Sequence, residues 1–179
     1  MENEKRPLVF MRGVAFFLFF ALLSAHLEIS AAGQKGTSLC DSITLENGAV
    51  ILAVSVSDLQ KSSSDLLISP DDIEKQIYRA PPYKCTMRSK TNFLKSLSYI
   101  IYVYNNSEQA RTEFNKMKKS FATVAKVDQI PGLGDETFRV EDSRFQRMVS
   151  IKGDLVLDVL NPKESNLQEQ IVRLVLETL

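Results

Sequence analysis

The spacing of apolar and polar residues predicts an ordered series of elements from residue 69 onward. Ser69-Pro70-Asp71-Asp72 is a typical helix start, because serine caps, proline suits the first turn and aspartates favour the positive end of the helix dipole. This helix should carry Ile73, Ile77 and Tyr78 inward and end before Ala80-Pro81-Pro82, since proline disfavours helix in the residue before it.

Two following segments have the composition of β-strands. Residues 83–89 alternate apolar and polar side chains, and residues 96–104 are rich in β-branched and aromatic ones, with "KTNFLK" (90–95) as the hairpin loop between them. The earlier apolar run 49–56 fits either a buried strand or a helix that starts near Thr44, and its periodicity does not decide between them. Residues 60–65, "QKSSSD", predict a polar loop.

An amphipathic helix is predicted after Asn106, which can cap it with Gln109 in the capping-box position. Its apolar stripe consists of Ala110, Phe114, Met117 and Phe121. Its last turns hold Lys116, Lys118 and Lys119, where the dipole favours cations. These lysines fit a solvated helix end, with an anionic partner as the alternative.

The last third predicts three strands, near 136–141, 145–151 and 155–160, and a helix that starts at Asn161-Pro162. The apolar stripe of that helix is Leu167, Ile171, Leu174, Val175 and Leu179. No parallel βαβ alternation is evident. We therefore expect an α+β domain, with a mostly antiparallel sheet of about five strands and helices packed on one face.

Residues 1–32 have the layout of a secretory signal peptide. A basic start precedes an apolar run of about 12 residues, shorter than the ~20 that a membrane span needs, and small residues precede Gly33. An uncleaved anchor is the alternative. Cleavage would leave one domain, residues 33–68 together with the 69–179 core, exported to the periplasm or outside the cell and without a membrane span.

Charge and histidine content exclude several functions. The 22 basic and 22 acidic residues balance, and residues 1–32 carry three of each, so no basic excess points to nucleic acid or an anionic membrane. The one histidine, His26, lies in the predicted signal peptide. The remaining chain therefore has no histidine for a Ser-His-Asp site, a Cys-His site or a His-ligated zinc site.

Two cysteines, Cys40 and Cys85, complete the reactive side chains. An even count in an exported chain favours one disulfide, and closing its loop would contribute about 4 kcal/mol. Two buried free thiols are the alternative. A catalytic thiol is disfavoured, because there is no CxxC and no histidine to activate it.

The segment "IPGLGDETF" (130–138) concentrates turn residues. Gly132 and Gly134 match only the start of a GxGxxG pattern, and the acids Asp135 and Glu136 would repel a phosphate. Calcium is a weak alternative, since the oxygen spacing is not that of an EF-hand. We interpret Pro131, Gly132 and Gly134 as a structural turn that starts a strand, and Gly153 as a second turn.

Acid pairs and tyrosines are the other candidate groups. Neither Asp135/Glu136 nor Glu141/Asp142 forms a facing acid pair, because neighbours on a strand point to opposite faces. A candidate ligand face is formed by Tyr83, Tyr99, Tyr102 and Tyr104. If helices cover only the other side of the sheet, these rings would be exposed; otherwise they form a second core layer.

Five quoted segments carry a family resemblance: "SPDDIEKQIY", "YKCTM", "EFNKMKK", "PGLGDETF" and "VSIKGDLVLDVL". In this order they resemble a family of bacterial envelope proteins, many of them lipoproteins of unknown function, which look like the extracellular sensor domain of a mycobacterial serine/threonine kinase. The resemblance implies an antiparallel sheet, a Cys40–Cys85 disulfide and a ligand-binding or accessory role without catalytic residues. The lipobox of the family is missing, and Thr137 stands where the family favours alanine.

We therefore predict a non-enzymatic exported envelope protein, with a ligand-binding or sensor-like role and an unknown small molecule or envelope protein as its partner. No catalytic, cofactor-binding or metal-binding residue is predicted. The alternative is an accessory subunit that docks on another envelope protein through an exposed apolar patch. A carboxylate-dependent hydrolase is the disfavoured third interpretation.

Overall fold

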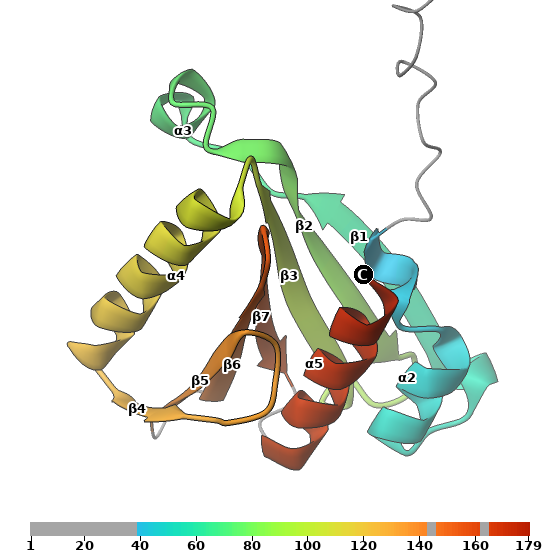
Figure 1. Cartoon of the computed structure of the whole chain (residues 1–179). Coiled ribbons are helices and arrows are strands. Elements are labelled where there is room, and N and C mark those ends of the chain that lie inside the picture. The colour runs from blue at the N-terminus through green and yellow to red at the C-terminus, as the bar shows by residue number, and fades with distance from the viewer. Residues whose placement is uncertain (1–38, 143–145, 162–164) are drawn as a thin grey trace, which may run out of the picture. The chain divides into compact units, whose positions relative to one another are not determined.

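The computed structural model describes residues 39–142, 146–161 and 165–179. Within them, seven strands form one antiparallel sheet in the order β1-β2-β3-β7-β6-β5-β4 (Figure 1). The strands are β1 (Leu59–Asp65), β2 (Tyr78–Ser89), β3 (Ser96–Tyr104), β4 (Lys126–Gln129), β5 (Glu136–Glu141), β6 (Gln146–Lys152) and β7 (Leu155–Asn161). The helices are α2 (Leu45–Leu52), α3 (Pro70–Glu74), α4 (Ser107–Ala122) and α5 (Ser165–Thr178), with short 3₁₀ helices η2 (Leu39–Ser42) and η3 (Val56–Asp58).

The predicted α+β class and antiparallel sheet are confirmed, with seven strands instead of about five. No helix in the described ranges has both the length and the apolarity to cross a membrane. The predicted signal peptide lies outside the described residues.

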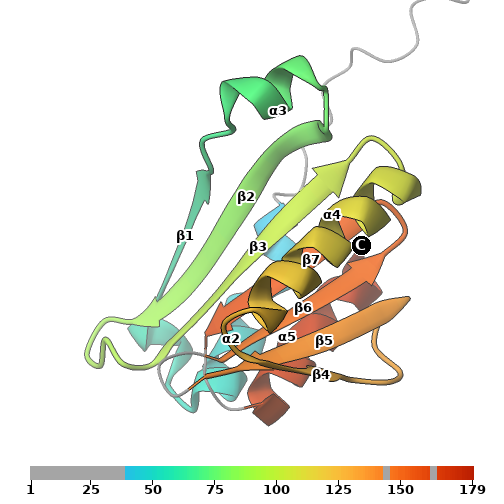
Figure 2. The same ribbon diagram turned by 90° about the vertical axis from the view of Figure 1, so that its left-hand side faces the viewer.

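Helices cover both faces of the sheet, which corrects the expectation that they pack on one face. Figures 1 and 2 show α4 against one face and α2 with α5 against the other. The central strand β3 gives the reason, because it buries Leu97 and Ile101 in the core under α2 and α5 and Tyr104 in the core under α4. A strand that is apolar on both faces needs cover on both.

The two edge strands, β1 and β4, account for the difference in strand number. Residues 60–65, predicted as a loop, lie in β1, which pairs along its length with β2. Leu59 is the buried residue of β1, and five of the six polar residues that follow it are exposed. Main-chain pairing does not require apolar side chains, and polar side chains on an edge strand discourage further pairing.

The apolar run 49–56 is divided between a helix and a turn. Thr44 caps α2, its Oγ1 accepting from the amide of Asn47 at 3.2 Å. Ala53, in the left-handed region at φ 49°, ends the helix. The helical alternative is therefore correct as far as Leu52, and Val56 begins η3.

The helix predicted from Ser69 to Arg79 is much shorter in the structure. Its start is as predicted, since the Ser69 hydroxyl accepts from the amide of Asp72 at 3.1 Å. It ends at Glu74, and Gln76 at φ 47° redirects the chain into β2. Pro81 and Pro82 lie inside β2, where the pairing register with β3 shifts. Pro81 favours extended backbone at Ala80, the residue before it, which is consistent with a strand at this point.

The remaining helices follow the predicted stripes in part, because Leu179, predicted in the stripe of the last helix, lies beyond α5 and is 41 % exposed. The Asn106 Oδ1 accepts from the amide of Gln109 at 2.8 Å, and Ala110 and Phe114 are fully buried beneath α4. In α5, Ile171 and Val175 are fully buried. The described part of α5 begins at Ser165, and residues 162–164 of the predicted start lie outside the description.

Candidate docking surface

The four tyrosines of the predicted ligand face do not lie together. Tyr99 is buried under α2 and α5, and its hydroxyl donates to the carbonyl oxygen of Cys40 at 3.2 Å. Tyr104 is buried on the opposite face of the sheet. Tyr83 and Tyr102 are half-buried. The structure therefore does not gather these rings on one open surface.

Tyr102 and Tyr104 instead belong to a ring cluster beneath α4 that includes Tyr78. The centroid of the Tyr78 ring lies 5.0 Å from that of Tyr104 and 6.3 Å from that of Tyr102. Burial raises the pKa of Tyr102 to about 12 and raises the pKa of Tyr104 as well, so both hydroxyls stay neutral at physiological pH. With α4 covering this face, the rings form a second core layer.

The 131–136 loop joins β4 to β5 and is fastened to the β6–β7 turn. Gly132 and Gly134 have positive φ angles of 75° and 57°. The Asp135 carboxylate accepts from the amide of Gly153 at 2.8 Å, and the Asp135 amide donates to the carbonyl of Ile151 at 2.7 Å. The loop therefore acts as a structural turn that links the two glycine-containing segments.

The acids near this loop have different partners, which argues against a shared calcium site. Glu136 pairs with Arg111 at 2.9 Å and with Lys118 at 2.7 Å, which fastens α4 to β5. Asp128 pairs with Lys126 at 2.9 Å, and the hydrogen bond from Lys126 lowers the Asp128 pKa. No group of three or more potential metal ligands occurs among the described residues.

A hollow of about 330 Å³ lies between this loop and the end of α5. Its lining includes Leu133 and Leu176 together with the charged residues Asp135, Lys152 and Arg173. The Lys152 ammonium group donates to the carbonyl of Leu176, so this cation already has a hydrogen-bond partner within the protein. This hollow is a concavity beside the predicted 131–136 turn.

The β2–β3 hairpin carries a feature that the sequence interpretation did not use. Figure 2 shows this hairpin extending from the end of the sheet opposite to α3. At its tip Phe93 is 75 % exposed and Leu94 is 78 % exposed. Two adjacent large apolar side chains thus face solvent on a projecting loop.

Side chains of the neighbouring η3 segment hold this loop in place. The Asp58 carboxylate accepts from the Ser89 hydroxyl at 2.5 Å and from the Thr91 amide at 3.1 Å. The hydrogen bond from Ser89 lowers the Asp58 pKa, so the carboxylate stays charged. Within the loop, Ser89 also accepts from the amide of Asn92 at 2.8 Å, and Asn92 accepts from the amide of Leu94 at 3.1 Å. Hydrogen bonds from Asp58 and within the loop therefore define the conformation of the tip.

Two lysines of this loop also form hydrogen bonds with η3 and with the end of α2. The Lys90 ammonium group donates to the carbonyl of Ser57 at 2.7 Å, and that of Lys95 donates to the carbonyl of Ala53 at 2.9 Å. Cations are favourable near the carbonyl end of a helix. The hairpin loop, η3 and the end of α2 consequently form one continuous structure.

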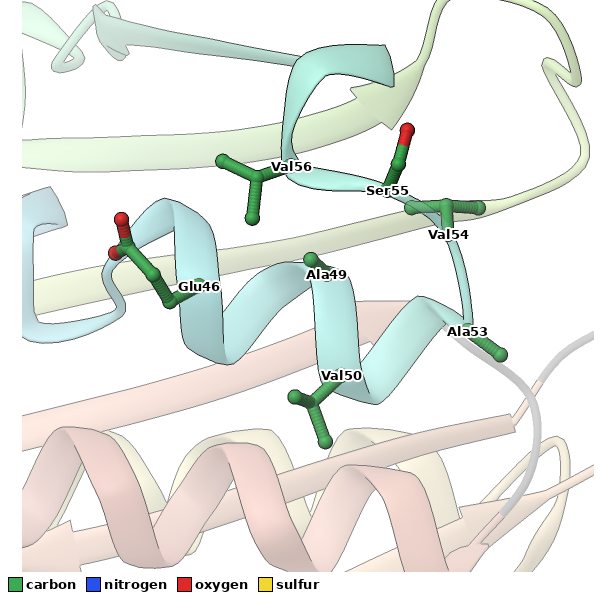
Figure 3. A pocket seen from close by; sticks show the side chains of 7 residues that line it. All are labelled: Glu46, Ala49, Val50, Ala53, Val54, Ser55 and Val56. Carbon is green, nitrogen blue, oxygen red and sulfur yellow. The ribbon is translucent and has the colours of Figure 1, made fainter.

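An open apolar hollow adjoins this structure. It measures about 710 Å³ and lies between α2 and the segment leading into η3 (Figure 3). Val50, Val54 and Val56 contribute its largest apolar side chains, and Val50 is 79 % exposed. We define the hairpin surface as Val50, Val54, Val56, Phe93 and Leu94.

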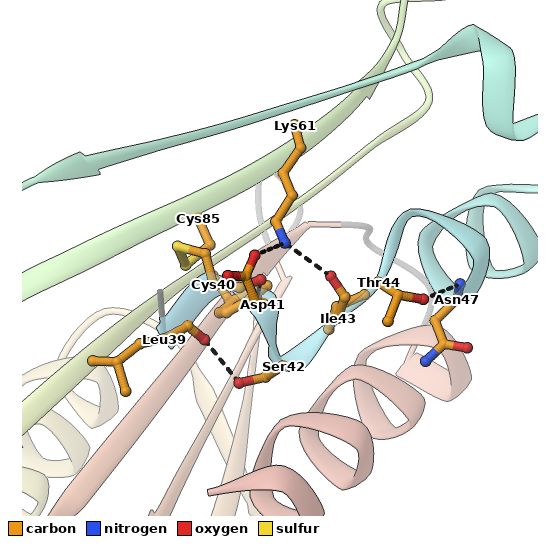
Figure 4. Close-up of polar contacts among 10 residues, drawn as sticks. Leu39, Cys40, Asp41, Ser42, Ile43, Thr44, Asn47, Lys61 and Cys85 are labelled. Carbon is orange, nitrogen blue, oxygen red and sulfur yellow. Dashed lines mark hydrogen bonds and ion pairs between the residues drawn. A yellow bond between two sulfur atoms is a disulfide. The ribbon is translucent and has the colours of Figure 1, made fainter. Parts of the chain in front are cut away.

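A disulfide fixes the start of the described chain to the sheet. Cys40 and Cys85 are bonded, with 5.4 Å between their Cα atoms, which confirms the predicted pair (Figure 4). Nearby, the Lys61 ammonium group contacts the Asp41 carboxylate at 2.7 Å and donates to the carbonyl of Ile43 at 3.2 Å. The disulfide and Lys61 together hold η2 against β1 and β2, and so position the chain that enters α2.

The apolar pair Phe93-Leu94 within an otherwise polar loop was the one available sequence signal for this surface. An apolar pair in a loop can equally fold back into a core. The exposure of both side chains and the hydrogen bonds from Asp58 appear only in the structure.

Comparison with known proteins supports the fold. No protein-family model matches the chain, and no curated protein matches it. The extracellular domain of PknH from Mycobacterium tuberculosis matches 74 % of this chain and 89 % of its own, with a TM-score of 0.50 and 12 % identity. The predicted resemblance to the extracellular sensor domain of a mycobacterial kinase is thus confirmed, and at this identity what is shared is the fold.

Proposed function

We propose that the protein is an exported, non-enzymatic binding domain of sensor-like fold that docks on another component of the cell envelope through the hairpin surface. One observation carries this proposal. Phe93 and Leu94 are exposed on a loop that Asp58 and the loop's own polar groups hold in one conformation.

The energetics of the loop support a binding role. Leaving a phenylalanine and a leucine in water forgoes about 2 kcal/mol for each side chain, and fixing the loop around them costs conformational entropy. Exposed apolar side chains on a fixed scaffold are typical of binding anchors, because little further ordering is needed on association.

Export is supported by the disulfide and by the predicted signal peptide. Disulfides persist in oxidising compartments outside the cytoplasm. If residues 1–32 form a cleaved signal, the exported protein should start near Gly33. Intact-mass measurement of the exported protein tests this, and a mass that still includes Met1 would support the anchor alternative.

A non-enzymatic role agrees with the use of the candidate acids. Asp135 accepts the amide of Gly153, and Glu136 is paired with Arg111 and Lys118. Each carboxylate thus has a structural partner. Incubating the exported protein with panels of chromogenic glycoside and ester substrates tests the proposal, and turnover that Glu136→Gln abolishes would contradict it.

Cell fractionation tests the docking role directly. The full chain and its Phe93→Ser/Leu94→Ser double variant are expressed with the same N-terminus, and the share of exported protein that stays with washed envelopes is measured. Val124→Ser is the matched control, because Val124 is 64 % exposed and lies outside the hairpin surface. The double variant should be released while the control stays bound. Equal retention of all three proteins would contradict the proposal.

A small-molecule ligand is the second candidate, and the hollow beside the 131–136 loop favours it. Its volume, about 330 Å³, is at the lower end of the range for ligand pockets. Arg173 lines it and suits an anionic ligand. A carboxylate or phosphate compound that raises the melting temperature of the wild type but not of Arg173→Gln would support this role. The absence of any such difference across a metabolite panel would count against it.

A further inference from the structure

We propose that the component bound by the hairpin surface is an anionic phospholipid bilayer. This inference rests on the proposed docking function and names its partner. It follows from the shape of the tip, the charges beside it and the distribution of charge along the sheet.

The shape of the tip suits a planar, fluid partner. Phe93 and Leu94 are adjacent in a loop, and both side chains are largely exposed to solvent. The neighbouring hollow is open, and its lining is mostly apolar, with Glu46 and Ser55 as its polar members. A bilayer accepts projecting apolar side chains at the boundary between headgroups and acyl chains without a complementary pocket.

The charges beside the tip complement an anionic surface. Residues 88–95 contain three basic residues and no acidic one: Arg88, Lys90 and Lys95. Asp58 is an acidic residue that contacts the loop, and its carboxylate accepts hydrogen bonds from Ser89 and Thr91. The balanced net charge of the chain therefore conceals a local basic cluster around the apolar pair.

The two lysines are held where they can contact lipid phosphates. Each ammonium group has three N–H donors and gives one of them to a backbone carbonyl, of Ser57 for Lys90 and of Ala53 for Lys95. The other donors remain for a partner. Because the carbonyls hold the ammonium groups beside the tip, little side-chain entropy is lost when a phosphate is bound.

The segment around α3 has the opposite charge. Residues 65–75 hold four acidic residues and one lysine. Figure 2 shows α3, which lies in this segment, at the far end of β2 from the hairpin. An anionic surface would therefore attract the hairpin end and repel the α3 end, which orients the domain before contact.

A tryptophan reporter tests the inference, because the chain has no tryptophan. Phe93→Trp places one fluorophore at the tip, and Val124→Trp places one at an exposed site outside the hairpin surface. The exported proteins are titrated with vesicles of phosphatidylcholine and with vesicles of phosphatidylcholine and phosphatidylglycerol in equal parts. Intact mass establishes that both variants have the same N-terminus.

With anionic vesicles, emission from position 93 should shift to the blue and be quenched by acyl-chain-brominated lipid. Raising the salt concentration should reverse the shift. In co-sedimentation, Phe93→Ser/Leu94→Ser and Arg88→Gln/Lys90→Gln should each weaken vesicle binding about tenfold. Lys119→Gln, which changes an exposed lysine of α4, should leave binding unchanged.

Unchanged emission from position 93, or an equal shift from position 124, would overturn the inference. If the protein does not bind vesicles while its retention by envelopes still depends on Phe93 and Leu94, the partner is a protein. The docking function then stands and the bilayer assignment is wrong. If envelope retention also fails to depend on these side chains, both proposals are wrong.

Discussion

Replacing Gly134 with alanine should destabilise the protein strongly, whereas the same change at Gly132 should have a small effect. Both glycines have positive φ angles in the same loop, 75° at Gly132 and 57° at Gly134. Their surroundings differ. A Cβ atom at position 134 would lie 2.5 Å from the carbonyl oxygen of Ile151 and 2.7 Å from Oγ of Ser150, whereas no atom lies within 4 Å of one at position 132.

The magnitude follows from two contributions. A left-handed backbone costs a non-glycine residue about 1 kcal/mol, and this applies at both positions. At position 134 the new methyl group also meets the main-chain carbonyl oxygen of Ile151 in β6, which cannot rotate away, so an overpacking cost of about 2 kcal/mol is added. We therefore expect a loss of about 3 kcal/mol for Gly134→Ala and about 1 kcal/mol for Gly132→Ala.

Urea denaturation followed by far-ultraviolet circular dichroism measures both values on the purified protein with its disulfide intact. For a domain of this size, 3 kcal/mol corresponds to a fall in melting temperature of about 10 °C. Equal effects of the two substitutions would refute the close approach of the 131–136 loop to β6. A neutral Gly134→Ala would refute the left-handed turn itself.

Three further predictions concern the disulfide, the loop carboxylate and a buried ion pair. Non-reducing peptide mapping should show Cys40 linked to Cys85, and replacing both with alanine should cost about 4 kcal/mol in urea denaturation; two alkylatable thiols in the purified protein would contradict this. Asp135→Ala should lose about 1 kcal/mol of stability, while Asp135→Asn, which keeps an acceptor oxygen, should change it by less than about 0.5 kcal/mol; a large loss in the asparagine variant would show that the charge itself is required. Arg147→Met should cost about 3 kcal/mol at pH 7, because it leaves the buried Asp158 carboxylate unpaired. Burial already raises the Asp158 pKa in the folded protein. A carboxylate whose pKa is higher in the folded state than in the unfolded state lowers stability at pH values above the folded-state pKa, and has no such effect below ~3.9. The stability deficit of Arg147→Met should therefore shrink as the pH is lowered toward 4, and a deficit independent of pH would refute this assignment.

Elements with a local chemical signature could be predicted from the sequence. The cap at Asn106 and the stripe through Phe114 located α4, and both features are present in the structure. The strand pattern of residues 96–104 located β3 in the same way. In each case the residues that define the element are close together in the chain.

Elements defined by long-range pairing could not be predicted. β1 is a serine-rich edge strand that pairs with β2, and β4 is a short edge strand that pairs with β5. Neither has a continuous apolar face, so their strand conformation depends on a neighbour elsewhere in the chain. The cover on both sheet faces depends likewise on where α4 packs, which no local pattern states.

The hairpin surface shows the same limit. Phe93 and Leu94 are recognisable in the sequence as an apolar pair, and both side chains are exposed in the structure. The loop that carries them is held by a hydrogen bond between Ser89 and Asp58, which are 31 residues apart in the chain. The tyrosines illustrate the reverse case. Their pattern suggested an open face, and the packing of α4 over Tyr102 and Tyr104 made them part of the core.

Site-specific photo-crosslinking in intact cells identifies what the hairpin tip contacts. A benzoylphenylalanine residue at position 93 samples whatever contacts the hairpin tip, and one at position 115 samples the exposed side of α4. We expect position 93 to form an adduct with an envelope component on irradiation and position 115 to form none. The mass of the adduct shows whether lipid or protein is attached. Equal labelling from both positions, or none from position 93, would contradict the claim that this hairpin is the docking surface.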